Sequence, residues 1–321
     1  MERVRVGVWG VGAWGEKHAR VYQSLPGAEL VGCFDHQLEK SRACVAKHGG
    51  VAFESAESLL AECEAVSIAV PTVTHRAATE QALAAGRHVL VEKPMAGTLA
   101  EADAMLQAAE RAGRALQVGQ VERFNPALLA ARPLVRGPKF IEAHRLALFQ
   151  PRSLDIDVVF DLMIHDIDAV LDFVGAPVVQ VSSVGVAVLS GNEDIANARI
   201  EFADGCVANL TASRVSQERL RRIRFFTADA YLSVDLFEKS GDVLRVDPRA
   251  FRPEAPHEAI RRGHLQVAPG EPLALELAAF LGSLRGSGAG AASGPEGREA
   301  LAVAEEVRAA MKRRATQWAL R

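Results

Sequence analysis

Residues 4 to about 119 repeat one pattern, in which a short β-branched run, a turn and a helical stretch follow one another. The runs predicted as strands are Val4–Val8, Glu29–Phe34, Ala65–Val70, Val89–Glu92 and Leu116–Val118. Helical patterns lie between them. Because strands that alternate with helices pair in parallel through right-handed crossovers, the pattern predicts an α/β fold with an open, doubly wound parallel sheet.

The pattern changes after about residue 120, where strand-like runs follow one another directly. They are Phe140–Phe149, Val178–Val188, Asn197–Phe202, Cys206–Ser213, Arg221–Phe226 and Ala230–Asp235. One helical stretch, Asp157–Val174, interrupts them, and a last helix is predicted from about Arg298 to Thr316. This order predicts an α+β domain with an antiparallel sheet. The 321-residue chain therefore divides into two predicted domains, residues 1–120 and 121–321.

Composition excludes several classes of protein. A hydrophobic fraction of 49% is that of a globular chain, and a net charge of -3 provides no overall field for nucleic acid or an anionic membrane. The chain starts without a secretory signal pattern, and no uncharged apolar run approaches the roughly 18 residues of a membrane span. The four scattered cysteines argue against a disulfide framework and against structural zinc. A cytoplasmic location is expected.

A glycine-rich segment follows the first predicted strand directly and opens the first helix. It contains Gly10, Gly12 and Gly15, with Ala13 and Trp14 between the last two. In a dinucleotide site, the first glycine makes a tight turn and the second lets the backbone approach the pyrophosphate. The third lets the helix pack closely on the strand. The helix N-terminus adds free N–H groups and a positive dipole end, so these five residues are predicted to bind a dinucleotide.

Asp35 lies 20 residues after Gly15, at the end of the second predicted strand. An acid at this place accepts hydrogen bonds from the ribose hydroxyls of an adenosine. A 2′-phosphate would face its negative charge, and His36 and Gln37 supply no Arg or Lys to hold one. NAD is therefore predicted in preference to NADP. The alternative is an ordinary glycine turn followed by an ordinary strand-end acid.

Two further polar segments follow predicted strands, where ligands bind in an open α/β sheet. Their candidate cofactor-binding residues are Pro71, Thr72, His75, Glu92 and Lys93. Pro94 restricts Lys93 to extended backbone geometry, so that this lysine stays at the strand end. The alternative for Lys93 is a solvated surface lysine.

Asp161 and His165 are four residues apart in the helical stretch, with Asp168 and Asp172 on the same predicted face. A carboxylate that fixes an imidazole ring and raises its basicity makes that histidine a general base. Two other interpretations stay open, a polar helix face and a metal site formed by Asp161, His165 and Asp168. Because no further ligand cluster accompanies them, no metal is predicted.

Taken together, these motifs resemble the glucose–fructose oxidoreductase / inositol dehydrogenase / MocA family. The resemblance rests on the glycine segment with His18, on Asp35, Pro71-Thr72-x-x-His75, Glu92-Lys93-Pro94 and Asp161-x-x-x-His165. It implies an NAD(P)-dependent dehydrogenase acting on CH–OH groups, with a Rossmann domain at residues 1–120. It also implies that residues 121–321 bind substrate and form an open, mostly antiparallel sheet through which a homodimer or homotetramer assembles.

A narrower resemblance links the chain to the branch of this family that contains UDP-N-acetylglucosamine 3-dehydrogenases. It rests on the segments 119–127, 152–168 and 213–218, although Gln120 stands where many relatives have histidine. The implied reaction oxidises a sugar hydroxyl to a ketone, on a nucleotide sugar such as UDP-N-acetylglucosamine at its 3-position.

The roles implied for the catalytic residues are a base for His165, an orienting carboxylate for Asp161 and a hydrogen bond from Lys93 to the reacting oxygen. Asp161 and His165, together with Arg123, Asn125 and Arg152, are the candidate substrate contacts; surface or interface salt bridges are the alternative role for the last three. Other possible functions are a family dehydrogenase for a free sugar, an inositol or a small carbonyl compound, and a non-catalytic NAD-sensing regulator. The basic run 219–224 fits a strand with one charged face better than a nucleic-acid site.

Overall fold

The structure is a computed structural model that describes residues 3–150, 156–286 and 290–319. It divides into two compact units, each made of two stretches of the chain. Unit 1 comprises Met1–Phe124 and Gly270–Leu301, and unit 2 comprises Asn125–Pro269 and Ala302–Arg321. Within the described residues, none of the helices combines the length and apolar character that a membrane crossing requires.

Unit 1 contains a seven-stranded sheet in the order β15-β6-β5-β4-β1-β2-β3. The strands are β1 (Val4–Trp9), β2 (Ala28–Phe34), β3 (Val51–Ala52), β4 (Ala65–Ile68), β5 (His88–Glu92), β6 (Leu116–Gly119) and β15 (Ala292–Ser293). All pairs are parallel except β15 with β6. The order reverses at β1, between β2 and β4, as in doubly wound sheets, which confirms the predicted class.

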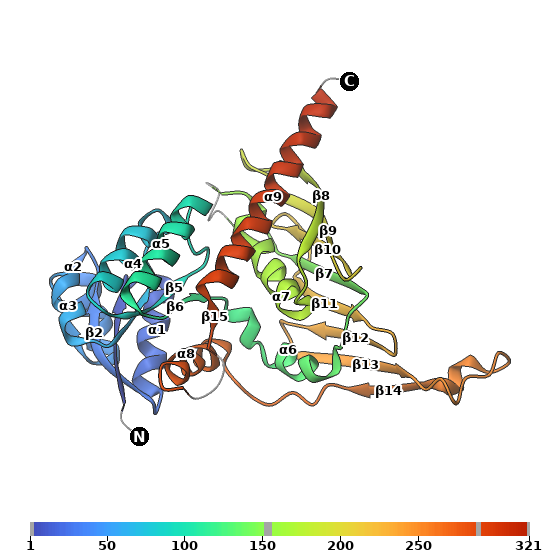
Figure 1. Cartoon of the computed structure of the whole chain (residues 1–321), viewed down its shortest axis with the longest axis horizontal. Helices are drawn as coiled ribbons and strands as arrows, with labels where there is room; N and C mark the ends of the chain where they lie inside the picture. Colours follow the sequence, from blue (N-terminus) through green and yellow to red (C-terminus); the bar gives the residue numbers. More distant parts are fainter. Residues whose placement is uncertain (1–2, 151–155, 287–289, 320–321) are drawn as a thin grey trace. The chain divides into compact units, whose positions relative to one another are not determined.

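Helices connect these strands (Figure 1). They are α1 (Ala13–Ser24), α2 (Leu38–His48), α3 (Ala56–Glu62), α4 (His75–Ala84), α5 (Leu99–Ala112) and α8 (Pro272–Ser283), with short turns η1 (Thr72–Thr74) and η2 (Val121–Phe124). Local sequence explains their ends. Thr98 and Glu101 form a capping box at the start of α5, and Gly113 ends that helix in the left-handed conformation.

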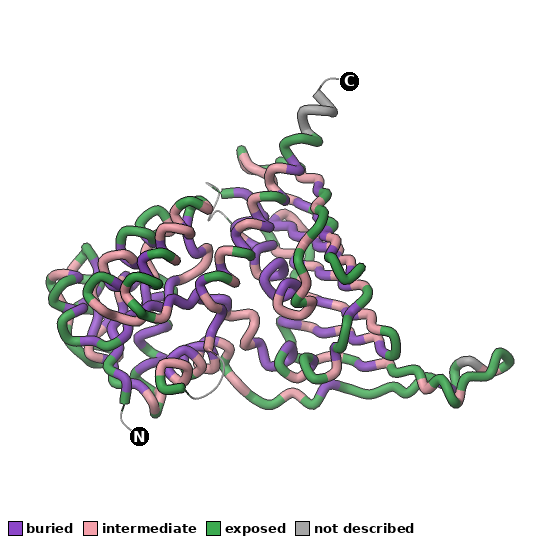
Figure 2. Tube along the Cα trace, viewed as in Figure 1, coloured by how far each residue is buried: buried purple, intermediate pink, exposed green. Residues whose placement is uncertain are grey.

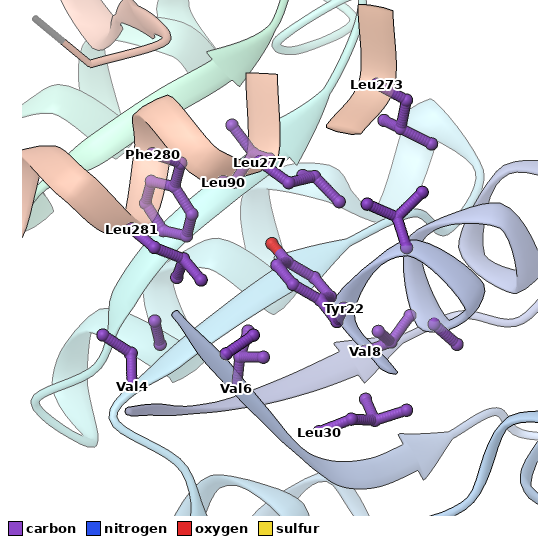
Figure 3. Close-up of a cluster of buried hydrophobic side chains, with 14 of the residues drawn as sticks. Val4, Val6, Val8, Tyr22, Leu30, Leu90, Leu273, Leu277, Phe280 and Leu281 are labelled. Atoms are coloured by element: carbon purple, nitrogen blue, oxygen red, sulfur yellow. The ribbon is translucent and has the colours of Figure 1, made fainter. Parts of the chain in front are cut away.

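The core of unit 1 joins distant parts of the chain. Figure 3 shows Tyr22 of α1 among Leu277 and Phe280 of α8 and the β1 side chains. All three named side chains are fully buried. Burying each large apolar side chain contributes about 1.5–3 kcal/mol, so α8 is held on unit 1 mainly by this cluster.

Unit 2 contains an eight-stranded sheet in the order β14-β13-β12-β11-β7-β10-β9-β8. The strands are β7 (Phe140–Leu146), β8 (Val178–Val186), β9 (Ile195–Phe202), β10 (Val207–Ser213), β11 (Leu220–Phe226), β12 (Ala230–Asp235), β13 (Ser240–Val246) and β14 (Ile260–His264). Only β7 and β10 pair in parallel, which confirms the mostly antiparallel sheet. Figure 2 shows every residue of the edge strand β14 exposed.

The helical elements of unit 2 are α6 (Pro126–Ala131), the turns η3 (Arg132–Leu134) and η5 (Pro256–Ala259), the π turn η4 (Val159–Met163), α7 (Ile164–Val174) and the later part of α9 (Gly294–Ala319). α7 packs on one face of the sheet. Phe173 of α7 meets Phe225 of β11 with ring centroids 4.5 Å apart. The sequence predicts a single helix over Asp157–Val174, and the structure has the π turn η4 followed by α7 in its place.

Candidate active site

The glycine segment after β1 has three different local constraints. Gly10 has φ +88°, and a Cβ atom built on it would lie 2.7 Å from the Ala69 carbonyl oxygen. A Cβ on Gly15 would lie 1.8 Å from the Gly10 oxygen, whereas one on Gly12 meets no atom within 4 Å. The first and third glycines are thus required by the fold itself. The second leaves the backbone open to a ligand, as in a dinucleotide cradle.

The N-terminus of α1 is also open. Gly12, Ala13 and Trp14 are exposed, and no side chain among the described residues caps the helix. The Trp14 ring lies beside Lys17, whose Nζ is 4.4 Å from the ring centroid. The first N–H groups of the helix are available to an anion, which suits the pyrophosphate of a dinucleotide.

Asp35 is buried directly beside this segment. Its Oδ2 accepts a hydrogen bond from the Val11 N–H at 3.0 Å, and its Oδ1 accepts one from the Gln37 N–H at 2.9 Å. His36 Nδ1 lies 3.1 Å from Oδ1. These contacts fix the carboxylate, while Oδ2 keeps a further lone pair for a ribose hydroxyl.

His75 connects the segments that follow β4 and β5. Its Nδ1 lies 2.9 Å from the Pro94 oxygen and its Nε2 lies 2.9 Å from the Val70 oxygen. The ring is buried, and burial is the main cause that lowers the pKa of His75, against the effect of the carbonyl contacts. Pro71 is exposed and Thr72 half-buried beside it. The ring thus holds two loops together, and direct contact of His75 with cofactor stays a prediction.

Glu92 and Lys93 lie half-buried at the carboxyl end of β5. The Oε1 atom of Glu92 is 2.9 Å from Nε2 of the buried His18, and its Oε2 accepts a bond from the Lys93 N–H at 3.3 Å. The predicted sites omitted His18, although it stands three residues after Gly15 on the first turns of α1. His18 of α1 thus holds the Glu92 carboxylate in place, and that carboxylate in turn fixes the backbone at Lys93.

Asp161 lies in the π turn and His165 in the first turn of α7, and both are half-buried. Asp157 stands just before the turn, and its Oδ1 accepts bonds from the Val159 and Phe160 N–H groups at 3.0 and 3.1 Å. Burial raises the pKa of Asp157, against those two bonds. π turns recur at functional sites, and this one widens the helical spacing just before His165.

A buried ion pair fixes α7 on the sheet. Arg145 of β7 donates from Nε and Nη2 to the two carboxylate oxygens of Asp166, at 2.9 and 2.8 Å. Asp168 is buried as well, and Asp172 pairs with Arg132. The predicted polar helix face is thus used partly for structure, and His165 lies in the first turn of the helix that Arg145 holds in place.

Unit 2 has a pocket of about 160 Å³ beside the π turn. Asp161 and Leu162 line it together with Phe237 and with three arginines, Arg214, Arg219 and Arg221. Arg219 and Arg221 are exposed. Arg221 shares its strand face with buried residues, whereas Arg222 and Arg224 on the opposite face pair with Asp235 and Glu142 at 3.2 and 2.6 Å.

Arg214 is held rigidly in the wall of this pocket. It donates from Nε to Asp194 Oδ1 at 2.8 Å and from Nη1 to the Ile156 oxygen at 2.9 Å. Burial opposes ionisation of Asp194, but hydrogen bonds from Ser190, Leu189 and Arg214 together hold its pKa well below the ordinary value. The pair therefore stays charged.

The three other predicted substrate residues have different placements. Arg123 Nη1 lies 2.6 Å from Glu296 Oε1 within unit 1. Asn125 is buried at the start of α6, where its Oδ1 accepts from the Ala127 N–H at 3.1 Å and its Nδ2 donates to the Leu236 oxygen at 2.9 Å. Arg152 lies outside the described residues. Substrate contact by any of the three stays a prediction.

The described residues contain no group of three or more His, Cys, Asp or Glu side chains placed to hold a metal ion. Asp161, His165 and Asp168 therefore do not form such a group in the described part of the chain.

Comparison with known sequences gives two family matches. The profile described as an oxidoreductase family with an NAD-binding Rossmann fold matches residues 4–120, and the GFO/IDH/MocA C-terminal domain matches residues 140–233.

Individual proteins are similar over different lengths. UDP-N-acetylglucosamine 3-dehydrogenase of Acidithiobacillus ferrooxidans is 40% identical over 97% of this chain and 98% of its own. Its crystal structure matches with a TM-score of 0.89. An inositol 2-dehydrogenase of Cereibacter sphaeroides is 33% identical over 51% of this chain and 52% of its own. An NAD-binding oxidoreductase of Klebsiella pneumoniae, 20% identical over 97% of this chain and 98% of its own, shares the fold with a TM-score of 0.87.

Proposed function

The chain belongs to the GFO/IDH/MocA oxidoreductase family, and on this premise we propose that it oxidises the 3-hydroxyl of a nucleotide sugar, UDP-N-acetylglucosamine being the first candidate. Membership confirms the predicted family and the prediction of a dehydrogenase that acts on CH–OH groups. The choice of substrate is supported by the Acidithiobacillus relative, which is similar over nearly its whole length.

One observation of this chain carries the proposal. Two exposed arginines, Arg219 and Arg221, line the same pocket as Asp161, and Arg214 in its wall is already paired with Asp194. Arginine forks match the oxygens of a diphosphate, so the pocket suits the charged part of a nucleotide sugar better than an uncharged polyol. Its volume of about 160 Å³ is below that of most small-molecule sites, so it would hold only a part of such a substrate.

The glycine segment and Asp35 fit a bound NAD, which would accept the hydride. Gly12 offers open backbone and α1 its free N–H groups, and Asp35 offers its carboxylate to the ribose. An acid at this position disfavours a 2′-phosphate, so NAD is proposed over NADP.

The catalytic roles are assigned from the family's motif. His165 accepts the proton of the sugar hydroxyl, and Asp161 stabilises the imidazolium that results. Lys93 donates a hydrogen bond to the reacting oxygen and stabilises its developing negative charge. A positioned base contributes about 10²–10⁴-fold to the rate, which sets the scale for its removal.

Assembly and location belong to the same proposal. We propose a homo-oligomer formed through the sheet of unit 2, where Val179 and Val186 of β8 are exposed apolar residues. The four buried, free cysteines suit a reducing cytoplasm.

Substrate choice is tested by incubating the protein with NAD and a panel of nucleotide sugars, free sugars and inositols, following the absorbance of reduced cofactor. We expect a response to UDP-N-acetylglucosamine. Arg219→Gln should raise its KM about tenfold with little effect on NAD, because one phosphate contact is lost. Arg222→Gln, which removes the same charge from a residue of β11 that does not line this pocket, is the control. A response confined to unphosphorylated polyols would refute the proposal.

A further inference from the structure

A second basic region lies in unit 1, at the end of the sheet opposite the glycine segment. Four arginines, Arg3, Arg87, Arg114 and Arg285, line a pocket of about 350 Å³ with His88 and Glu64. Most of these residues stand at or just before the amino ends of β1, β4, β5 and β6, and Arg285 follows α8. The glycine segment and Lys93 follow the carboxyl ends of β1 and β5. We call this region the basic pocket.

Within the described residues, the lining of the basic pocket holds four arginines and one acid. Among the described residues, none of the four guanidinium groups lies within ion-pair distance of a carboxylate. Glu64 is the one acid of the lining, and its Oε2 already accepts a bond from the Arg5 N–H at 3.0 Å. Other exposed arginines of unit 1 do pair, as Arg42 does with Glu39 at 2.7 Å.

A buried donor of the pocket also points to a ligand. The Nε atom of Arg87 is buried and has no acceptor among the described residues. Such a donor is unfavourable unless something accepts its hydrogen bond. The Nδ1 of His88 accepts from the Ala115 N–H at 3.0 Å, so the neutral ring carries its proton on Nε2. Burial first, and then the charge of Arg114, lower the pKa of His88 and keep that ring neutral.

We infer that the basic pocket binds a small phosphate-bearing anion, at a site separate from the proposed cofactor and substrate sites. Several guanidinium forks converge on one space, and they match tetrahedral phosphate oxygens. A volume of about 350 Å³ lies in the range of small-molecule sites, so a phosphorylated metabolite fits as well as inorganic phosphate does. Anion binding at the basic pocket does not depend on the proposed reaction.

The test is titration calorimetry on the full chain saturated with NADH, which occupies the glycine segment. Inorganic phosphate and a hexose phosphate are the probes, with acetate as the singly charged comparison. We expect both phosphate probes to bind more tightly than acetate. The double variant Arg87→Gln/Arg114→Gln should weaken their binding about tenfold or more, since two forks are lost.

The matched control is Arg42→Gln/Arg313→Gln, which removes the same charge from exposed positions on α2 and α9. Equal weakening in both double variants would mean non-specific attraction and would overturn the inference, as would absence of binding by either probe. Tighter binding of inorganic phosphate identifies the free anion as ligand, and tighter binding of the hexose phosphate identifies a metabolite.

A second measurement does not depend on how the variants fold. Phenylglyoxal modifies accessible arginines, and mass spectrometry reports the extent at each site. With phosphate present, modification of Arg87 and Arg114 in the wild-type chain should slow several-fold while that of Arg42 is unchanged. Unprotected Arg87 and Arg114 would contradict the inference. Neither experiment requires turnover, so failure here leaves the proposed reaction untouched.

Discussion

The three glycines after β1 differ in what a methyl group would meet, and this difference predicts opposite phenotypes. In Gly15→Ala the new Cβ would lie 1.8 Å from the Gly10 oxygen, whereas real Cβ contacts stay above 3.0 Å. Loop and helix must therefore separate by more than an ångström. Overpacking of this kind costs about 1–3 kcal/mol or more of unfolding free energy.

Gly12→Ala meets no protein atom within 4 Å, and the backbone at Gly12, with φ -70° and ψ -164°, is open to alanine. The free energy of unfolding should stay level or rise by about 0.4–1 kcal/mol, because alanine restricts the unfolded chain. The same Cβ occupies the space through which a pyrophosphate approaches the helix. We expect the Kd for NAD to rise about tenfold, equivalent to about 1.4 kcal/mol.

Urea unfolding followed by tryptophan fluorescence measures the first quantity, since Trp9 precedes the glycine segment and Trp14 lies within it, and calorimetric titration measures the second. Gly27→Ala is the matched control, because its Cβ also meets nothing within 4 Å but lies in another turn. Wild-type affinity in Gly12→Ala would show that the backbone there does not face the pyrophosphate. Wild-type stability in Gly15→Ala would refute the packing argument.

Three further substitutions test other parts of the molecule. His165→Ala should lower kcat by about 10²–10⁴-fold while the Kd for NAD stays constant, as initial rates and calorimetry will measure; normal turnover would remove His165 from the mechanism. Asp35→Ala should reduce the ratio of kcat/KM with NAD to that with NADP by about tenfold, since it removes the charge that opposes a 2′-phosphate. Asp194→Asn should cost about 3–5 kcal/mol at neutral pH, because Arg214 loses its charged partner. The folded-state pKa of Asp194 is below its ordinary value of 3.8, so its stabilisation is complete above that pH and disappears as the pH falls below it. Urea midpoints at a series of pH values should therefore fall more steeply between about pH 4 and 2 in the wild type than in the variant, and parallel curves would contradict the assignment.

The order of strands and helices in unit 1 could be predicted because each strand is a short buried run between turn signals. α8 shows where such prediction stops. Leu273, Leu277, Phe280 and Leu281 recur at helical spacing, so the helix itself is visible in the sequence. Its packing against Tyr22 depends on contacts across some 250 residues, which no local pattern encodes.

Some residues of the candidate site can be predicted from local sequence, and others depend on hydrogen bonds to distant parts of the chain. The glycine roles follow from backbone geometry that any dinucleotide cradle needs, so the motif predicts them. Asn125 precedes Pro126, an arrangement typical of a helix N-cap followed by proline at the first helical position, and the structure uses it that way. The family resemblance predicts a substrate contact for Asn125 instead, and that contact stays a prediction. The same polar group serves either purpose, and only its hydrogen-bond partners separate the two.

The arginines in and just before β11 extend this reasoning to charge. Arg222 and Arg224 have carboxylate partners across the strand, so their charge is already used in holding the sheet. Arg219 has no such partner among the described residues and lines the pocket of Asp161. At physiological salt, exposed charges beyond about 8–10 Å are largely screened, so the net charge of -3 is not felt at this pocket. An anionic ligand responds to the few nearby cations whose charge the protein has not neutralised. The ionic partners of each arginine are therefore a better predictor of ligand chemistry than the net charge of the chain.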